Sequence, residues 1–115
     1  MKQYKPDEKT DDLLETILSL KNLNEARAFF RDLCTLKEIK DLTDRWEIAK
    51  LIEQGAPYRD IAKKLGTSTT TVSRVALWFN NGMGGYRLML DRLNLDKNNE
   101  HHASSSFGKG LRVYN

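Results

Sequence analysis

Residues 58–79, YRDIAKKLGTSTTTVSRVALWF, constrain the fold more than any other stretch of the chain. Ile61, Ala62 and Leu65 share one face of a short helix, and Gly66 follows them directly. Glycine adopts the left-handed backbone conformation of a helix end without strain, so the first helix should stop at Gly66. Ala62 is small enough for a second helix to approach closely. The pattern predicts two short helices packed across a tight turn.

The second helix should begin at Ser68 or Thr69, where a hydroxyl can accept a hydrogen bond from the free N–H groups of the first turn. Its inward face consists of Val72, Val75 and Phe79, at spacings of three and four. The spacing of the alanine, the glycine and the two valines is that of bacterial repressor helix-turn-helix units, whose second helix lies in the DNA major groove. We therefore predict a DNA-binding helix-turn-helix, with an ordinary helical hairpin as the alternative.

The outward face of the second helix lacks acidic side chains and is expected to meet the bases. Arg74 could hold a guanine through two hydrogen bonds, whereas hydroxyl groups bond either base or phosphate and discriminate weakly. The expected DNA-contacting residues in this segment are Ser68, Thr69, Thr70, Thr71, Ser73 and Arg74. On the preceding helix, Tyr58, Arg59 and Lys63 are better placed for phosphates, where they would position the domain and add salt dependence.

The charge distribution agrees with this prediction. The net charge of the whole chain is +3, which alone is weak evidence for nucleic-acid binding. Residues 56–93 hold six basic and two acidic side chains, a net charge of +4, whereas residues 1–34 and 35–55 each carry −1. The excess positive charge therefore accompanies the predicted helix-turn-helix, as a phosphate-facing surface requires. Without the motif, a solvated basic face would be the preferred interpretation.

Apolar residues recur at helical spacing elsewhere, and no strand-like alternation appears, so we predict an all-α fold. Two N-terminal helices are expected before residue 34, the second one capped by Asn22 or Asn24. Thr35 and Glu38 form a capping box that starts the longest helix, which should end near Gln54.

A last short helix is expected to end at Leu93. From Asn94 onward the chain is poor in apolar residues and rich in Asn, Ser and Gly. We therefore predict a single domain over residues 1–93 and a disordered polar tail over residues 94–115.

Several classes of protein are disfavoured. The chain has no catalytic triad, phosphate-cradling glycine loop or metal-binding cysteine pair, so we expect no enzyme, no cofactor and no metal site. His101 and His102 lack a converging third ligand. The single cysteine, Cys34, excludes an intrachain disulfide and suits a reducing cytoplasm. Because the N-terminal residues are charged and no apolar run approaches bilayer length, we expect neither a signal peptide nor a membrane span.

Four segments resemble Trp-repressor-like proteins, most of all the branch labelled YerC/YecD. They are LCT at 33–35, DRWEIAKLI at 44–52, LGTSTTTVSR at 65–74 and LMLDRL at 88–93. The resemblance covers about residues 10–93. It implies a six-helix protomer whose N-terminal helices intertwine with those of a second copy.

The residues themselves also favour a homodimer. Six short amphipathic helices carry more apolar surface than about 90 ordered residues can bury alone. A two-fold dimer would present two recognition helices about 34–36 Å apart, or a multiple of that distance, to a palindromic operator in double-stranded DNA.

The resemblance also raises the question of L-tryptophan as a corepressor. In the Trp repressor, the indole lies between two arginines, which correspond to Arg45 and Arg74 here. Directly after the second arginine, the Trp repressor has a glycine and, three positions further on, a serine. At these two positions this chain has Val75 and Trp78. One or both of these larger side chains can fill the cavity and hold the recognition helix without a ligand. The candidate ligand pocket, expected to be self-filled, comprises Thr35, Arg45, Arg74, Val75 and Trp78, and we expect L-tryptophan not to act as corepressor.

We predict a bacterial, cytoplasmic, sequence-specific DNA-binding regulator of transcription, with repression as the favoured mode and a homodimer as the active form. Two alternatives remain open. A helix-turn-helix module of DNA replication or transposition is disfavoured by the lack of a nucleotide-binding or nuclease segment. A helical protein-interaction module that never binds DNA is disfavoured by the acid-free face of the second helix.

Overall fold

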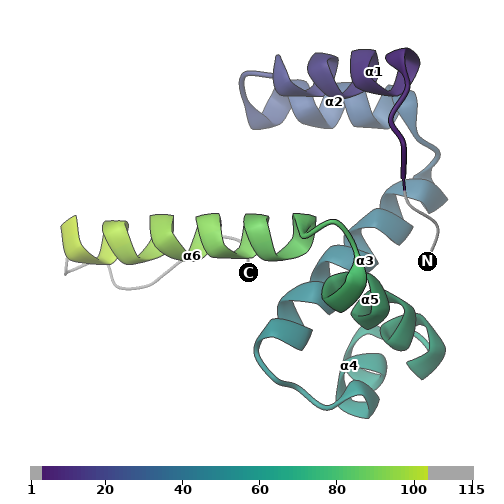
Figure 1. Ribbon diagram of the computed structural model, residues 1–115, viewed down its shortest axis with the longest axis vertical. Helices are drawn as coiled ribbons and strands as arrows, with labels where there is room; N and C mark the ends of the chain where they lie inside the picture. The colour runs from purple at the N-terminus through teal and green to yellow at the C-terminus, as the bar shows by residue number, and fades with distance from the viewer. Residues whose placement is uncertain (1–3, 104–115) are drawn as a thin grey trace. The chain divides into compact units, whose positions relative to one another are not determined.

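The structure, a computed structural model, describes the backbone of residues 4–103 and the side chains of residues 4–96. Within these residues the chain forms six helices and no strand (Figure 1). The helices are α1 (Glu8–Leu18), α2 (Leu23–Leu33), α3 (Leu36–Glu53), α4 (Tyr58–Leu65), α5 (Thr69–Asn81) and α6 (Gly85–Ala103). The predicted all-α, six-helix fold is therefore confirmed.

Side-chain caps explain where the first three helices begin. The carboxylate of Asp7 accepts the N–H of Thr10 at 2.7 Å, and this bond holds the pKa of Asp7 below its ordinary value. Asn22 accepts the N–H three residues later at 2.9 Å. Thr35 accepts the N–H of Glu38 at 3.1 Å, and the Glu38 carboxylate accepts the N–H of Thr35 at 2.9 Å. The predicted capping box is thus formed.

The chain divides into two compact units, Met1–Leu42 and Thr43–Asn115. The first unit holds α1, α2 and the beginning of α3, and no residue of α1 or α2 is buried. Phe29 and Phe30 are half-buried, with ring centroids 5.9 Å apart in an edge-to-face arrangement. The exposed leucines of this unit include Leu13, Leu14, Leu18, Leu23, Leu33 and Leu36. In the single chain, the helices α1 and α2 therefore lack a core of their own.

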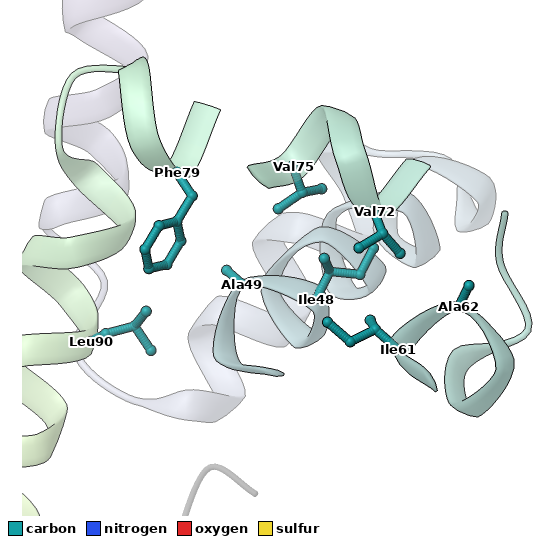
Figure 2. Packing of buried hydrophobic residues seen from close by; sticks show 8 residues of the cluster. All are labelled: Ile48, Ala49, Ile61, Ala62, Val72, Val75, Phe79 and Leu90. Carbon is teal, nitrogen blue, oxygen red and sulfur yellow. The ribbon is translucent and has the colours of Figure 1, made fainter. Parts of the chain in front are cut away.

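The second unit, in contrast, has a core to which four helices contribute (Figure 2). Its buried members are Ile48 and Ala49 of α3, Ile61 and Ala62 of α4, Val72, Val75 and Phe79 of α5, and Leu90 of α6. Each of the larger apolar side chains contributes about 1.5–3 kcal/mol to the stability of the fold when it is buried. This cluster holds α5 against α3, α4 and α6.

The turn between α4 and α5 has the predicted geometry. Gly66 adopts the left-handed conformation, with φ 68° and ψ 34°, and its N–H donates to the carbonyl of Ala62. Ala62 is only 7% exposed, so a larger side chain would separate the helices. Ser68 caps α5 by accepting the N–H of Thr71 at 3.0 Å. The predicted helix-turn-helix is confirmed as a fold element.

The connection between α5 and α6 consists of residues 82–84. The N–H of Gly82 donates to the carbonyl oxygen of Trp78 at 2.8 Å. A Cβ atom at Gly82 would lie 2.5 Å from that same oxygen, which is part of the backbone and cannot rotate away. Gly84 has a φ of 84°, the left-handed region that favours glycine. The turn thus depends on glycine at two positions for two different reasons.

We expect Gly82→Ala to lower the free energy of unfolding by about 1–3 kcal/mol, because the added methyl group forces the backbone of α5 to shift. Gly85→Ala is the matched control, since a Cβ atom there meets nothing within 4 Å. Urea unfolding of both variants checks the prediction. Equal stability of the two variants would contradict it.

The structure differs from the sequence-based expectation at the end of α6. This helix continues to Ala103, so the prediction of a disordered tail starting at Asn94 is wrong for residues 94–103. No glycine or proline interrupts these residues, and asparagine weakens a helix without ending it. The amide of Asn94 also donates to a carboxylate oxygen of Glu53 in α3 at 3.3 Å. The rest of the expected tail, residues 104–115, lies outside the described residues, and the domain boundary at residue 93 stays a prediction.

Candidate nucleic-acid interface

The outward face of α5 is the surface on which the sequence places the base-reading residues. Its side chains Thr69, Thr70, Ser73 and Arg74 are all exposed, whereas Val72 and Val75 on the inward face are 0% and 4% exposed. The helix contains no acidic residue. The negatively charged phosphate backbone of DNA could therefore approach this face without meeting a like charge. The orientation of the face agrees with the prediction, and its contact with DNA stays a prediction.

Two of the predicted DNA contacts already have partners within the helix. The hydroxyl oxygen of Ser68 lies 3.0 Å from that of Thr71, and it also accepts the N–H of Thr71 at 3.0 Å. Ser68 is exposed, whereas Thr71 is partly buried. Capping is therefore a sufficient structural task for both residues, and DNA contact would be an additional one.

Helix α4 carries the predicted phosphate-binding residues. Tyr58, Arg59 and Lys63 are exposed, as is Lys64, which the sequence analysis did not select. Both lysines lie in the last turn of the helix, where a positive charge also stabilises the helix dipole. The lysines therefore have a structural explanation that is independent of DNA.

The residues of the expected ligand pocket have different surroundings. Val75 belongs to the buried core, and Arg45 and Arg74 are exposed. Trp78 is 51% exposed and lines an open hollow of about 470 Å³. Thr35 belongs to the first unit, and the other four residues belong to the second. The ligand role of the five residues stays a prediction.

The hollow is mostly apolar and is lined by Trp46, Trp78, Gly82, Met83, Gly85, Tyr86 and Met89. Tyr86 stacks on Trp46 at a centroid distance of 6.4 Å and on Phe79 at 6.1 Å. Burial raises the pKa of Tyr86, and the positive charge of Arg45 opposes that shift. This stack connects α3, α5 and α6 at one side of the hollow.

Sequence reasoning also missed a buried lysine on α3. Lys50 is 8% exposed, and its ammonium group pairs with the Glu47 carboxylate at 2.6 Å. The same group lies 5.9 Å from the centroid of the Trp46 ring. A lysine is seldom buried unless it is paired. No sequence pattern distinguishes this lysine from a solvated one.

Asn80 and Arg87 were missed for another reason. Arg87 Nη2 donates to Asn80 Oδ1 at 3.0 Å, and the guanidinium carbon lies 4.5 Å from the centroid of the Phe79 ring. The two residues are seven apart and on different helices, so helical periodicity does not pair them. Their contact depends on the turn at residues 82–84.

Other kinds of site find no support in the described part of the chain. Among residues 4–96 no group of three or more His, Cys, Asp or Glu side chains could hold a metal ion. Nor does any helix of the described segment have the length and apolar character needed to cross a bilayer.

Residues 8–94 match the family model described as Trp repressor protein. The chain belongs to the Trp repressor family. The resemblance drawn from its sequence motifs is thereby confirmed. The Trp repressor family is a regulatory family rather than an enzyme family, and its fold includes a DNA-binding helix-turn-helix.

Individual relatives from three bacteria agree with the family assignment. The chain is 45% identical over 83 residues to the uncharacterized protein YerC of Bacillus subtilis (strain 168), an alignment that covers 72% of this chain and 80% of the relative. A TrpR-like protein from Eubacterium eligens ATCC 27750 superposes with a TM-score of 0.74 at 44% identity, covering 76% of this chain and 91% of that one. A putative Trp repressor from Staphylococcus aureus gives 0.74 at 42% identity, covering 77% and 89%.

Proposed function

We propose that this member of the Trp repressor family is a sequence-specific DNA-binding regulator of bacterial transcription, with repression as its favoured mode. It acts as a homodimer on a palindromic operator, and the α5 helix of each protomer reads one half-site. The dimer orients the two helices by two-fold symmetry, which is why the operator is an inverted repeat.

One observation carries the proposal: an exposed, acid-free helix face that includes Arg74 is supported from behind by the buried cluster around Ile48. Reading bases requires side chains held in a fixed orientation, and α5 has four buried residues, Val72, Val75, Ala76 and Phe79. The basic side chains of α4 lie in the same unit and supply the phosphate contacts.

Selection of bound sequences from a random pool of duplex DNA tests the proposal directly. Recovery of an inverted repeat is the expected result, because it reports both sequence reading and two-fold symmetry. Recovery of a single unrepeated site would contradict binding of the operator by a two-fold symmetric dimer. Failure to enrich any sequence would overturn the proposal in favour of a protein-interaction module.

On the selected operator, Arg74→Ala should cost about 1–3 kcal/mol and relax the sequence preference at one position of each half-site. Lys63→Ala should weaken binding to all sequences alike and reduce the salt slope by about one unit. The difference arises because one side chain lies on the base-reading helix and the other on the preceding helix.

Titration of each variant with operator and with random DNA, over a range of salt concentrations, measures both effects. Asp91→Ala serves as a control, since this exposed residue lies on α6, away from the helix-turn-helix in sequence. An equal loss on operator and random DNA for Arg74→Ala would refute its role in reading bases.

We further propose that L-tryptophan does not control binding. Val75 belongs to the buried core, and Trp78 stands where the tryptophan-binding relative has a small hydroxyl residue. The recognition helix then needs no ligand to hold it in place. Calorimetry with millimolar L-tryptophan should show no saturable binding, and operator affinity should be the same with and without it.

L-phenylalanine at the same concentration controls for nonspecific effects of an amino acid on the titration. A tenfold tightening of operator binding by L-tryptophan alone, equivalent to about 1.4 kcal/mol, would show that the argument from Val75 and Trp78 is wrong.

A further inference from the structure

We infer that Arg87 is a positioning residue for DNA reading. From α6 it holds the C-terminal turn of the recognition helix α5 through the Asn80 amide and the Phe79 ring. The inference rests on the proposed function, because it concerns how α5 is held while its other end reads DNA.

Two contacts fix the guanidinium group of Arg87. Its Nη2 atom donates to Asn80 Oδ1 at 3.0 Å, and its central carbon lies 4.5 Å from the centroid of the Phe79 ring. Both partners belong to the last turn of α5. A planar guanidinium can hydrogen-bond with its edge while its face lies on an aromatic ring, and a lysine ammonium cannot reproduce this combination.

Asn80 transmits the restraint to the backbone of the recognition helix. Its side-chain amide nitrogen donates to the carbonyl oxygen of Ala76 at 3.0 Å, one turn earlier in α5. The amide thus uses its nitrogen for α5 and its oxygen for Arg87. Because the nitrogen donates and the oxygen accepts, the amide cannot turn over without losing both bonds.

Phe79 connects the last turn of α5, where Arg87 binds, to the core. Its side chain is 6% exposed, and its ring stacks on Tyr86, which directly precedes Arg87 in α6. Tyr86 in turn stacks on Trp46 of α3. The end of α5 is therefore held by α3 and α6 together. On the solvent-exposed side of this end, Arg87 contributes both the hydrogen bond to Asn80 and the cation–π contact with Phe79.

This restraint should matter for operator binding more than for random DNA. Reading bases needs α5 in one orientation, and affinity falls in proportion to the fraction of molecules that hold it. Binding to phosphates tolerates a spread of orientations because it carries no sequence information. Loosening the end of α5 should therefore reduce the ratio of operator affinity to random-DNA affinity.

Two variants separate positioning from a direct phosphate contact. Arg87→Lys keeps the charge and loses the planar group, and Arg87→Gln loses the charge. For both variants we expect the affinity ratio to fall about fivefold to tenfold with the salt slope unchanged. Arg92→Lys is the matched control, an exposed arginine on the same helix, and it should leave the ratio unchanged.

A phosphate contact predicts a different result. Arg87→Gln would then weaken operator and random DNA alike and reduce the salt slope by about one unit. A purely structural role would lower the unfolding temperature and leave the ratio unchanged in the folded protein. Either result would overturn the inference.

A double variant tests the route through Asn80. If Arg87 acts through the amide, Asn80→Ala combined with Arg87→Gln should reduce the affinity ratio less than the product of the two single effects. Independent effects that simply multiply would contradict this route.

Amide hydrogen exchange without DNA separates this inference from the proposed function. Exchange in the last turn of α5 should accelerate in Arg87→Lys and not in Arg92→Lys. If the unmodified protein shows no sequence preference, the proposed function fails, and the exchange data still decide whether Arg87 restrains α5. Equal exchange in both variants would overturn the restraint itself.

Discussion

The protein is expected to remain dimeric at low micromolar concentration, and Phe30→Ala is expected to destabilise that dimer by about 3–5 kcal/mol. The expectation follows from the burial of the N-terminal unit. None of the residues of α1 and α2 is buried in the single chain, although both helices carry several leucines. Ordering these helices costs about 1–2 kcal/mol per residue in backbone entropy, which exposed apolar side chains do not offset. A second copy is the surface that we propose covers them.

Phe29, Phe30 and Trp46 are predicted to lie at or near the shared surface. All three are half-buried in the single chain, so each retains apolar area for a partner to cover. Sedimentation velocity should give a dimer, and the unfolding midpoint should rise with protein concentration, because folding and association are then coupled. Phe30→Ala should lower the fraction of dimer in sedimentation velocity and should lower the unfolding midpoint at a given protein concentration.

Asp32→Ala is the matched control for this experiment, since it truncates an exposed residue of the same helix. A compact, stable monomer at low micromolar concentration would contradict the dimer. A Phe30→Ala effect that is independent of protein concentration would show instead that the ring acts within one chain.

The sequence predicted best those features that depend on neighbours along the chain. Gly66, Ser68 and the pair Thr35 and Glu38 act within one turn of backbone, and the structure gives each of them its predicted geometry. The inward face of α5 followed from its helical spacing, because burial of a periodic apolar stripe requires no knowledge of the partner helix. These local signals were sufficient to identify the helix-turn-helix.

Contacts across a turn could not be predicted in the same way. Whether Arg87 meets Asn80 depends on the path of the backbone through Gly82, and whether Lys50 is buried depends on neighbouring helices. Composition also failed for residues 94–103, because a helix that has already started extends at little cost per residue through weak helix formers. The common role of the candidate ligand residues stays a prediction, because it was implied by family resemblance rather than by spacing.

Ile48→Ala should be the most damaging single truncation in the helix-turn-helix unit, with a cost of about 2–5 kcal/mol in the free energy of unfolding. Ile48 has no exposed surface, and its cluster includes Ile61 of α4 and Val72 of α5 (Figure 2). Removing its side chain leaves a cavity behind both helices of the motif. Since small domains are stable by only about 5–15 kcal/mol, much of that stability would be lost.

The conservative replacement Ile48→Val makes the test quantitative. It removes one methylene group and should cost about 0.5–1.5 kcal/mol, so the two variants should fall in order of the volume removed. Urea unfolding of both variants at one fixed protein concentration makes the two values comparable, because association then contributes equally to both. At a temperature where Ile48→Ala is still folded, its preference for operator over random DNA should also decrease, because α5 then rests on a cavity. A cost below about 1 kcal/mol for Ile48→Ala would mean that this side chain does not support the recognition helix.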